Sequence, residues 1–256
     1  GRYNFGPQLV SCVEIEELVV GNKTLTIDDY LKCRVLDFLV KLYIDRDPFF
    51  EVFGVLKWLN ISAIDLLTYL RDYELVGYPQ FEKVINSYVE SCRGVLFDSP
   101  EELTIFFREH VESYLSNDYG FNEMLTHIAM AVSIARNETH SILENSAINY
   151  LRSLKVLTPL LEKYIKQAVD FASKRKFDIN DIESVKTGLY DYDFVEGRRF
   201  GYKINPAELK TKSTRFSFIH SDISKQFINE AIGHWGNESY PKLGKLLQKN
   251  NLFLMD

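Results

Sequence analysis

Cysteine is scarce in this sequence. Only Cys12, Cys33 and Cys92 occur among 256 residues, and no two of them have the CxxC spacing of a zinc or redox motif. The odd count, without a signal peptide, favours a reducing, cytoplasmic setting in which disulfides are rare. We therefore expect each thiol to act as a small buried hydrophobe rather than as a ligand.

Long apolar runs and clustered basic residues are also missing. No stretch approaches the roughly 20 apolar residues that cross a bilayer, and the longest candidate, 35–44, is interrupted by Asp37 and Lys41. The formal net charge of -6 and the pI near 5.5 disfavour a nucleic-acid surface, which requires clustered Lys and Arg. We predict that neither a membrane nor a nucleic acid is a partner.

Motifs that carry chemistry do not occur. There is no GxSxG nucleophile motif and no phosphate-binding glycine loop, and HExxH is absent because no two histidines lie within one helical turn. Whether the chain is an enzyme is therefore left open by its motifs. We expect the five histidines to be satisfied core or surface residues, with a metal site built from distant segments as the alternative. They are His110, His127, His140, His220 and His234.

Composition and periodicity favour a mainly α-helical, bundle-like fold. The chain is 46% hydrophobic and 14% aromatic, which is enough for a sizeable core. Capping residues or prolines that precede apolar stripes predict helix starts at Thr26, Ser62, Pro79 and Ser99-Pro100. The first stripe is predicted to contain Ile27, Leu31, Val35, Phe38, Leu39 and Leu42. Residues 26–177 form one predicted helical domain, with a break near Thr158 because Pro159 interrupts the pattern.

The two ends of the chain differ from this helical middle. Residues 1–25 are interpreted as a strand-like connector from a missing upstream domain, since Val13 and Ile15 alternate with acidic residues and position 1 is not Met. Residues 178–256 are interpreted as a β-ribbon plus closing helices that pack on the same core. The small β-hairpin is placed near residues 186–219, with Tyr190–Val195 paired to Phe200–Ile204 and a further short strand at Arg215–Ile219.

The densest aromatic pattern in the chain supplies the candidate binding surface. Aromatic rings alternate with polar residues along the ribbon, and two arginines lie between them, so this surface could stack a flat ligand or bind a partner strand. The alternative is that the rings form the covered face of a hairpin. The candidate residues are Tyr190, Tyr192, Phe194, Arg198, Arg199, Phe200 and Tyr202.

Three segments resemble one protein family in the same order along the chain. They are VEIEELVVG at 13–21 leading to TLTIDDYLKCRVLDFLVKLY at 24–43, DPFFEVFGVLKWLNISAIDLL at 47–67, and FINEAIGHWGNESYPKLGKLLQKNN at 227–251. Together they resemble the C-terminal region of radical SAM proteins that carry an N-terminal cobalamin-binding domain. The middle, from about Val95 to Phe177, matches only in being helical.

The resemblance implies a parent enzyme whose reaction centre lies elsewhere. Such a parent binds an iron–sulfur cluster through a CxxxCxxC loop, cleaves S-adenosylmethionine and uses cobalamin, and none of those ligands maps onto this chain. We therefore carry over no catalytic, cofactor-binding or metal-binding residue. The implied role is a non-catalytic accessory domain that packs on the upstream radical SAM barrel of the same polypeptide and shapes the access of a small-molecule substrate.

Two other functions remain open at this point. The acidic, helix-rich composition with its aromatic ribbon is also typical of a standalone protein-interaction or regulatory module. A small-molecule-binding helical protein, with a pocket built from scattered residues, is the third hypothesis. The accessory-domain hypothesis predicts that the chain alone is colourless and inactive, whereas the standalone module predicts a start codon close to Gly1.

Overall fold

The computed structural model describes residues 2–11, 15–46, 48–115, 122–175 and 181–249. Strands β1 (Arg2–Phe5) and β2 (Gln8–Ser11) form an antiparallel hairpin that turns through Gly6, whose φ is +60°. Residues 15–25 that follow have no regular structure, so the strand predicted there is wrong for Ile15–Val20, while 12–14 lie outside the described residues. We call residues 2–11 and 15–25 the N-terminal arm.

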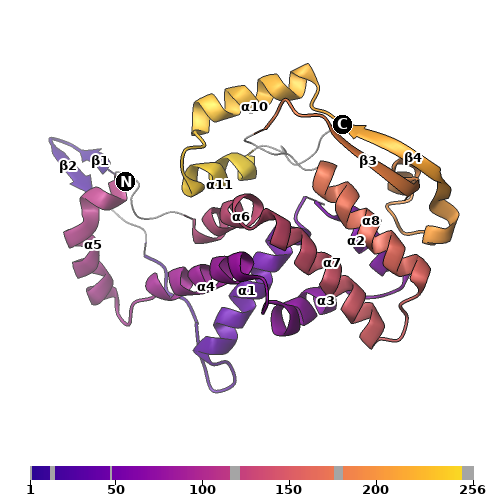
Figure 1. The fold of residues 1–256 in the computed structure, drawn as a ribbon. Coiled ribbons are helices and arrows are strands. Elements are labelled where there is room, and N and C mark those ends of the chain that lie inside the picture. The colour runs from indigo at the N-terminus through magenta and orange to yellow at the C-terminus, as the bar shows by residue number, and fades with distance from the viewer. Residues whose placement is uncertain (1, 12–14, 47, 116–121, 176–180, 250–256) are drawn as a thin grey trace.

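Helix α1 (Ile27–Tyr43) lies at the centre of the molecule (Figure 1). The predicted start is confirmed, because the Oγ1 of Thr26 accepts a hydrogen bond from the backbone N–H of Asp29 while the carboxylate of Asp29 accepts one from the N–H of Thr26, each at 3.1 Å. The predicted stripe from Leu31 to Leu42 is buried. Ile27 is an exception at 43% exposed, because the first turn of α1 projects beyond its neighbours.

The remaining helices of the main body follow α1 along the chain. They are α2 (Phe50–Trp58), α3 (Ala63–Tyr69) with a π-helical turn at Leu70–Glu74, α4 (Pro79–Gly94), α6 (Glu123–Ser133), α7 (Arg136–Ser153) and α8 (Pro159–Arg175). Ser62 and Pro79 begin helices as predicted, and the break before Pro159 is confirmed because α7 ends at Ser153. These helices share one buried core that extends from Leu31 to Phe218.

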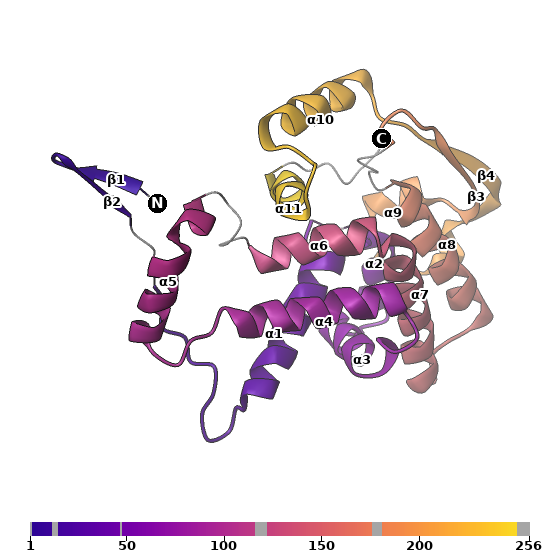
Figure 2. The same ribbon diagram turned by 60° about the vertical axis from the view of Figure 1, so that its left-hand side comes forward.

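Helix α5 (Pro100–Leu115) lies to one side of this body, next to the N-terminal hairpin, in both views (Figures 1 and 2). Its start is confirmed, since the Oγ of Ser99 accepts a hydrogen bond from the N–H of Glu102 at 3.1 Å. Where they are described, its apolar side chains are half-buried, except that Ile105 is exposed. An ion pair of 2.5 Å between Arg2 and Glu112 ties the arm to this helix.

The second sheet is where the predicted strand pairing is wrong. Strand β3 (Lys186–Tyr192) pairs antiparallel with β4 (Lys210–Phe218), not with the segment at 200–204. Helix α9 (Phe194–Arg199) and a 3-10 turn at Pro206–Leu209 lie between the two strands. The Asp193 side chain caps α9 by accepting from the N–H of Glu196 at 2.8 Å, and this local cap favours a helix over the alternating strand.

Helices α10 (Asp222–Trp235) and α11 (Tyr240–Lys249) close the described chain. They form a second, smaller apolar cluster with α6, made of Ala129, Ala231, Leu243, Leu246 and Leu247. A Cβ at Gly244 would lie 2.6 Å from the carbonyl oxygen of Leu125, so glycine is what lets α11 approach α6 so closely. The fold is thus mainly α-helical with two small antiparallel sheets, which confirms the predicted class.

Candidate functional site

The aromatic residues of the predicted surface lie mostly inside the protein. Tyr190, Tyr192 and Phe194 are buried against Phe171 and Tyr164 of α8, with ring centroids 4.6–5.6 Å apart. The hydroxyls of the two tyrosines form hydrogen bonds within the protein. Tyr190 donates to Asp170 Oδ2 at 2.7 Å, and Tyr192 donates to a backbone carbonyl of α8 at 3.2 Å. These rings cover the core rather than facing a ligand in solvent.

Tyr202 is also buried, in a loop with left-handed backbone. Its φ is +55°, and its hydroxyl donates to the carbonyl of Phe194 at 2.8 Å. A Cβ at Gly54 of α2 would lie 2.4 Å from the Cβ of Tyr202, so the absence of a side chain at Gly54 allows this loop to dock. The exposed part of the predicted set is Arg198, Arg199 and Phe200, and Arg199 pairs with Glu196 at 2.8 Å.

A buried ion pair lies below this loop, and the sequence analysis did not find it. Glu51 of α2 is fully buried, and its Oε1 lies 2.8 Å from Nη2 of Arg175, whose side chain is 12% exposed. Tyr164 donates to the backbone carbonyl of Glu51 at 3.2 Å. Burial, followed by the nearby Glu51 charge, raises the pKa of both Tyr164 and Tyr202. The sequence signal that could have indicated this pair is the acidic Glu51 within the apolar run Phe49–Leu56.

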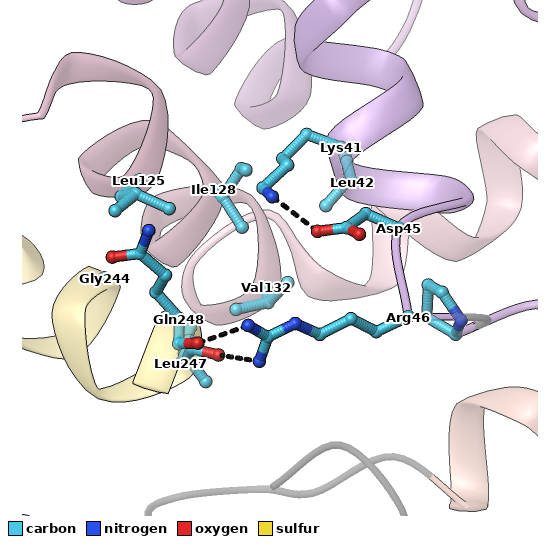
Figure 3. Close-up of a pocket in the computed structure, with 11 residues that line it drawn as sticks. Lys41, Leu42, Asp45, Arg46, Leu125, Ile128, Val132, Gly244, Leu247 and Gln248 are labelled. Atoms are coloured by element: carbon cyan, nitrogen blue, oxygen red, sulfur yellow. Dashed lines mark hydrogen bonds and ion pairs between the residues drawn. The ribbon is translucent and has the colours of Figure 1, made fainter. Parts of the chain in front are cut away.

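A hollow lies between α1, α6 and α11 (Figure 3). It contains about 500 Å³ of empty space when its open mouth is included. Its walls are apolar side chains from all three helices, and its mouth carries charged and amide groups. The lining residues are Lys41, Leu42, Asp45, Arg46, Pro48, Leu125, Ile128, Val132, Gly244, Leu247 and Gln248.

The charged residues at this mouth have different partners. Lys41 and Asp45, one turn apart on α1 and its extension, form an ion pair of 2.5 Å. Arg46 reaches across the mouth and donates to the carbonyls of Leu247 at 3.4 Å and Gln248 at 2.5 Å (Figure 3). Arg46 has φ +64°, a conformation that favours glycine, and its bonds to the last carbonyls of α11 help to hold it there.

The histidines have separate neighbours, and among the described residues none of them belongs to a group that could hold a metal ion. The Nδ1 of His127 lies 2.7 Å from the Glu123 carbonyl and its Nε2 lies 3.0 Å from the hydroxyl of Ser87, which links α6 to α4. Burial lowers the pKa of His127. His110 stacks on Phe106 at 4.2 Å, while His140 packs on an aromatic ring and His234 lies beside a tryptophan.

The described residues do not fit a metal or cluster site. Nowhere among them do three or more His, Cys, Asp or Glu side chains come together as they would around an ion. Cys92 is buried as expected, whereas the expectation is wrong for Cys33, which is exposed on α1, and Cys12 lies outside the described residues. An iron–sulfur cluster therefore finds no set of thiolates in this part of the chain.

Two further findings complete the description. Within the described ranges, every helix is too short or too polar to cross a bilayer. No protein-family model, curated protein or solved structure matches the chain.

Proposed function

We propose that this chain is a non-catalytic, helical accessory module of a larger radical SAM enzyme that uses cobalamin. The support is that three segments of the chain resemble the C-terminal region of that family in the same order. In this proposal the upstream part of a cytoplasmic enzyme binds S-adenosylmethionine, the iron–sulfur cluster and cobalamin. The module packs on the upstream barrel and shapes the access of a small-molecule substrate.

The exposed apolar side chains of the N-terminal arm are the observation that carries this proposal. Phe5 is 80% and Val19 77% exposed, and Tyr3, Leu9 and Leu18 are each more than half exposed. Apolar side chains grouped in this way commonly mark a protein contact surface. A two-stranded hairpin is at best marginally stable in water by itself. The arm is therefore the part of the chain best suited to pack on a preceding domain.

The first test is the reading frame upstream of Gly1. A long extension that contains a CxxxCxxC loop supports the proposal, because that loop supplies the three thiolates that the described chain lacks. A start codon directly before Gly1 would refute it.

Hydrogen exchange tests the role of the arm in that longer polypeptide. We expect the arm amides to exchange slowly in the parent and quickly in the chain alone, because an upstream domain would bury them. Phe5→Ser combined with Val19→Ser should restore fast exchange in the parent. The matched control is Val76→Ser, since Val76 is 81% exposed but lies outside the arm. Equal exchange in the parent and in the isolated chain would contradict arm docking.

A standalone interaction module is the second candidate, and one observation on α10 favours it. Ile223 and Phe227, four residues apart on that helix, are 69% and 63% exposed and so form an apolar strip on its outer side. This candidate predicts that Phe227→Ser abolishes capture of a protein partner while arm variants do not. The opposite pattern would support the accessory module.

A further inference from the structure

The pocket between α1, α6 and α11 combines an apolar interior with an excess of positive charge at its mouth. Leu42, Ile128, Val132 and Leu247 supply apolar walls, and the side chains of Lys41, Asp45, Arg46 and Gln248 also line the pocket (Figure 3). The ionic groups that line the mouth are Lys41, Asp45 and Arg46, which sum to one positive charge. A ligand that fits both parts has an apolar body and an anionic end.

Arg46 is the group best placed to bind that anionic end. The ion pair with Asp45 at 2.5 Å already neutralises Lys41. Arg46 instead donates to two backbone carbonyls, and among the described residues no carboxylate lies within ion-pair distance of its guanidinium. The carbonyl end of a helix carries only about half a negative charge, so roughly half of the Arg46 charge remains uncompensated. The guanidinium also keeps N–H donors beyond the two that these bonds use.

We propose that this pocket binds a medium-chain carboxylic acid. The alkyl chain would lie against Leu42, Ile128 and Val132, and the carboxylate would accept hydrogen bonds from Arg46 at the mouth. This inference rests on the pocket alone and holds whether or not the N-terminal arm docks on another domain.

Octanoate, octanol and acetate together test both parts of the site. We expect octanoate to bind with a Kd on the order of 1 mM, given its size, and to shift the methyl resonances of Leu42, Ile128, Val132 and Leu247 in a saturable way. Octanol should bind roughly tenfold more weakly because it cannot form the charge-assisted hydrogen bonds. Acetate should not bind measurably, and added salt should weaken octanoate binding but not octanol binding.

Two variants test the assigned roles independently. Arg46→Met should remove the preference for octanoate over octanol, and Val132→Phe should block both ligands by filling the pocket while leaving the bonds to α11 intact. Arg93→Met is the matched control, because Arg93 is another exposed arginine, paired with Asp28 at the end of α4. It should bind octanoate like the unmodified chain.

Each alternative outcome would overturn the proposal. One is the absence of saturable shifts up to about 20 mM octanoate, twenty times the expected Kd. Equal binding of octanol and octanoate by the unmodified chain would show that the pocket binds through apolar contacts alone, without a role for Arg46. Unchanged octanoate binding in Val132→Phe would place the ligand elsewhere on the molecule.

Discussion

The buried pair between Glu51 and Arg175 offers the sharpest test of this fold. At 2.8 Å the two charges attract by about 6 kcal/mol at an effective dielectric constant of about 20. The desolvation of both ions offsets most of that attraction. Replacing only one partner with methionine leaves a buried charge without its counter-ion, so we expect each single variant to lose about 3–5 kcal/mol of unfolding free energy. The double variant should lose much less than the sum.

Urea unfolding followed by circular dichroism measures these differences, provided that the slope with denaturant stays constant. The matched control is the pair Glu162–Lys166 on α8, which has a similar separation of 2.7 Å but side chains that are 34% and 52% exposed. Removing either member of that exposed pair should change the unfolding free energy far less than removing either member of the buried pair, because solvent screens exposed charges. A loss below about 1 kcal/mol for Glu51→Met would refute the reasoning, because it would place the buried pair in the class of surface pairs. If Glu51→Met does not fold, Glu51→Gln supplies the milder comparison.

Three further predictions concern single side chains. Tyr190→Phe should destabilise the chain by about 0.5–1.5 kcal/mol in urea unfolding, because it removes the 2.7 Å hydrogen bond to Asp170 while the carboxylate keeps its ion pair with Lys174, and a loss near zero would contradict this. Burial lowers the pKa of His127 below its ordinary 6.5, so in acid the unfolded chain binds more protons than the folded chain does. Stability should be full above about pH 6.5 and fall as the pH drops through the lower folded-state pKa, and His127→Gln should flatten this dependence. Gly244→Ala should lower the melting temperature, with a cost of about 1–3 kcal/mol, because its Cβ would lie 2.6 Å from a backbone oxygen of α6. Gly233→Ala, in open space on α10, should instead raise stability by about 0.5–1 kcal/mol.

Helix starts and the first buried stripe could be predicted from the sequence because they depend on near neighbours. The reciprocal bonds of Thr26 and Asp29 join residues three positions apart, and Pro159 restricts only its own turn. Burial from Leu31 to Leu42 follows from a spacing that places these side chains on one face of α1. The exposure of Ile27 could not be predicted, since it depends on where the neighbouring helices end.

The prediction of the strand pairing was wrong for a related reason. Alternation over Tyr190–Val195 and over Phe200–Ile204 is compatible with two paired strands. The Asp193 cap instead begins a helix at Phe194, and the contact of Tyr202 with Gly54 docks the following residues as a loop. Burial of Tyr190 and Tyr192 was one of the two expectations for the ribbon. Whether these rings form an exposed binding surface or the covered face of a hairpin depends on α8, whose aromatic side chains cover them.

The sequence by itself determined the mainly helical class, the helix starts at Thr26, Ser62, Pro79 and Ser99-Pro100, and a β element near residues 186–219. Those features depend on capping, proline geometry and periodicity within a few residues. Only the tertiary structure decided that β3 pairs with β4, that Glu51 meets Arg175, and that three helices enclose the Arg46 pocket. Each of these joins residues that are far apart along the chain, so their meeting depends on how the helices pack rather than on any local pattern.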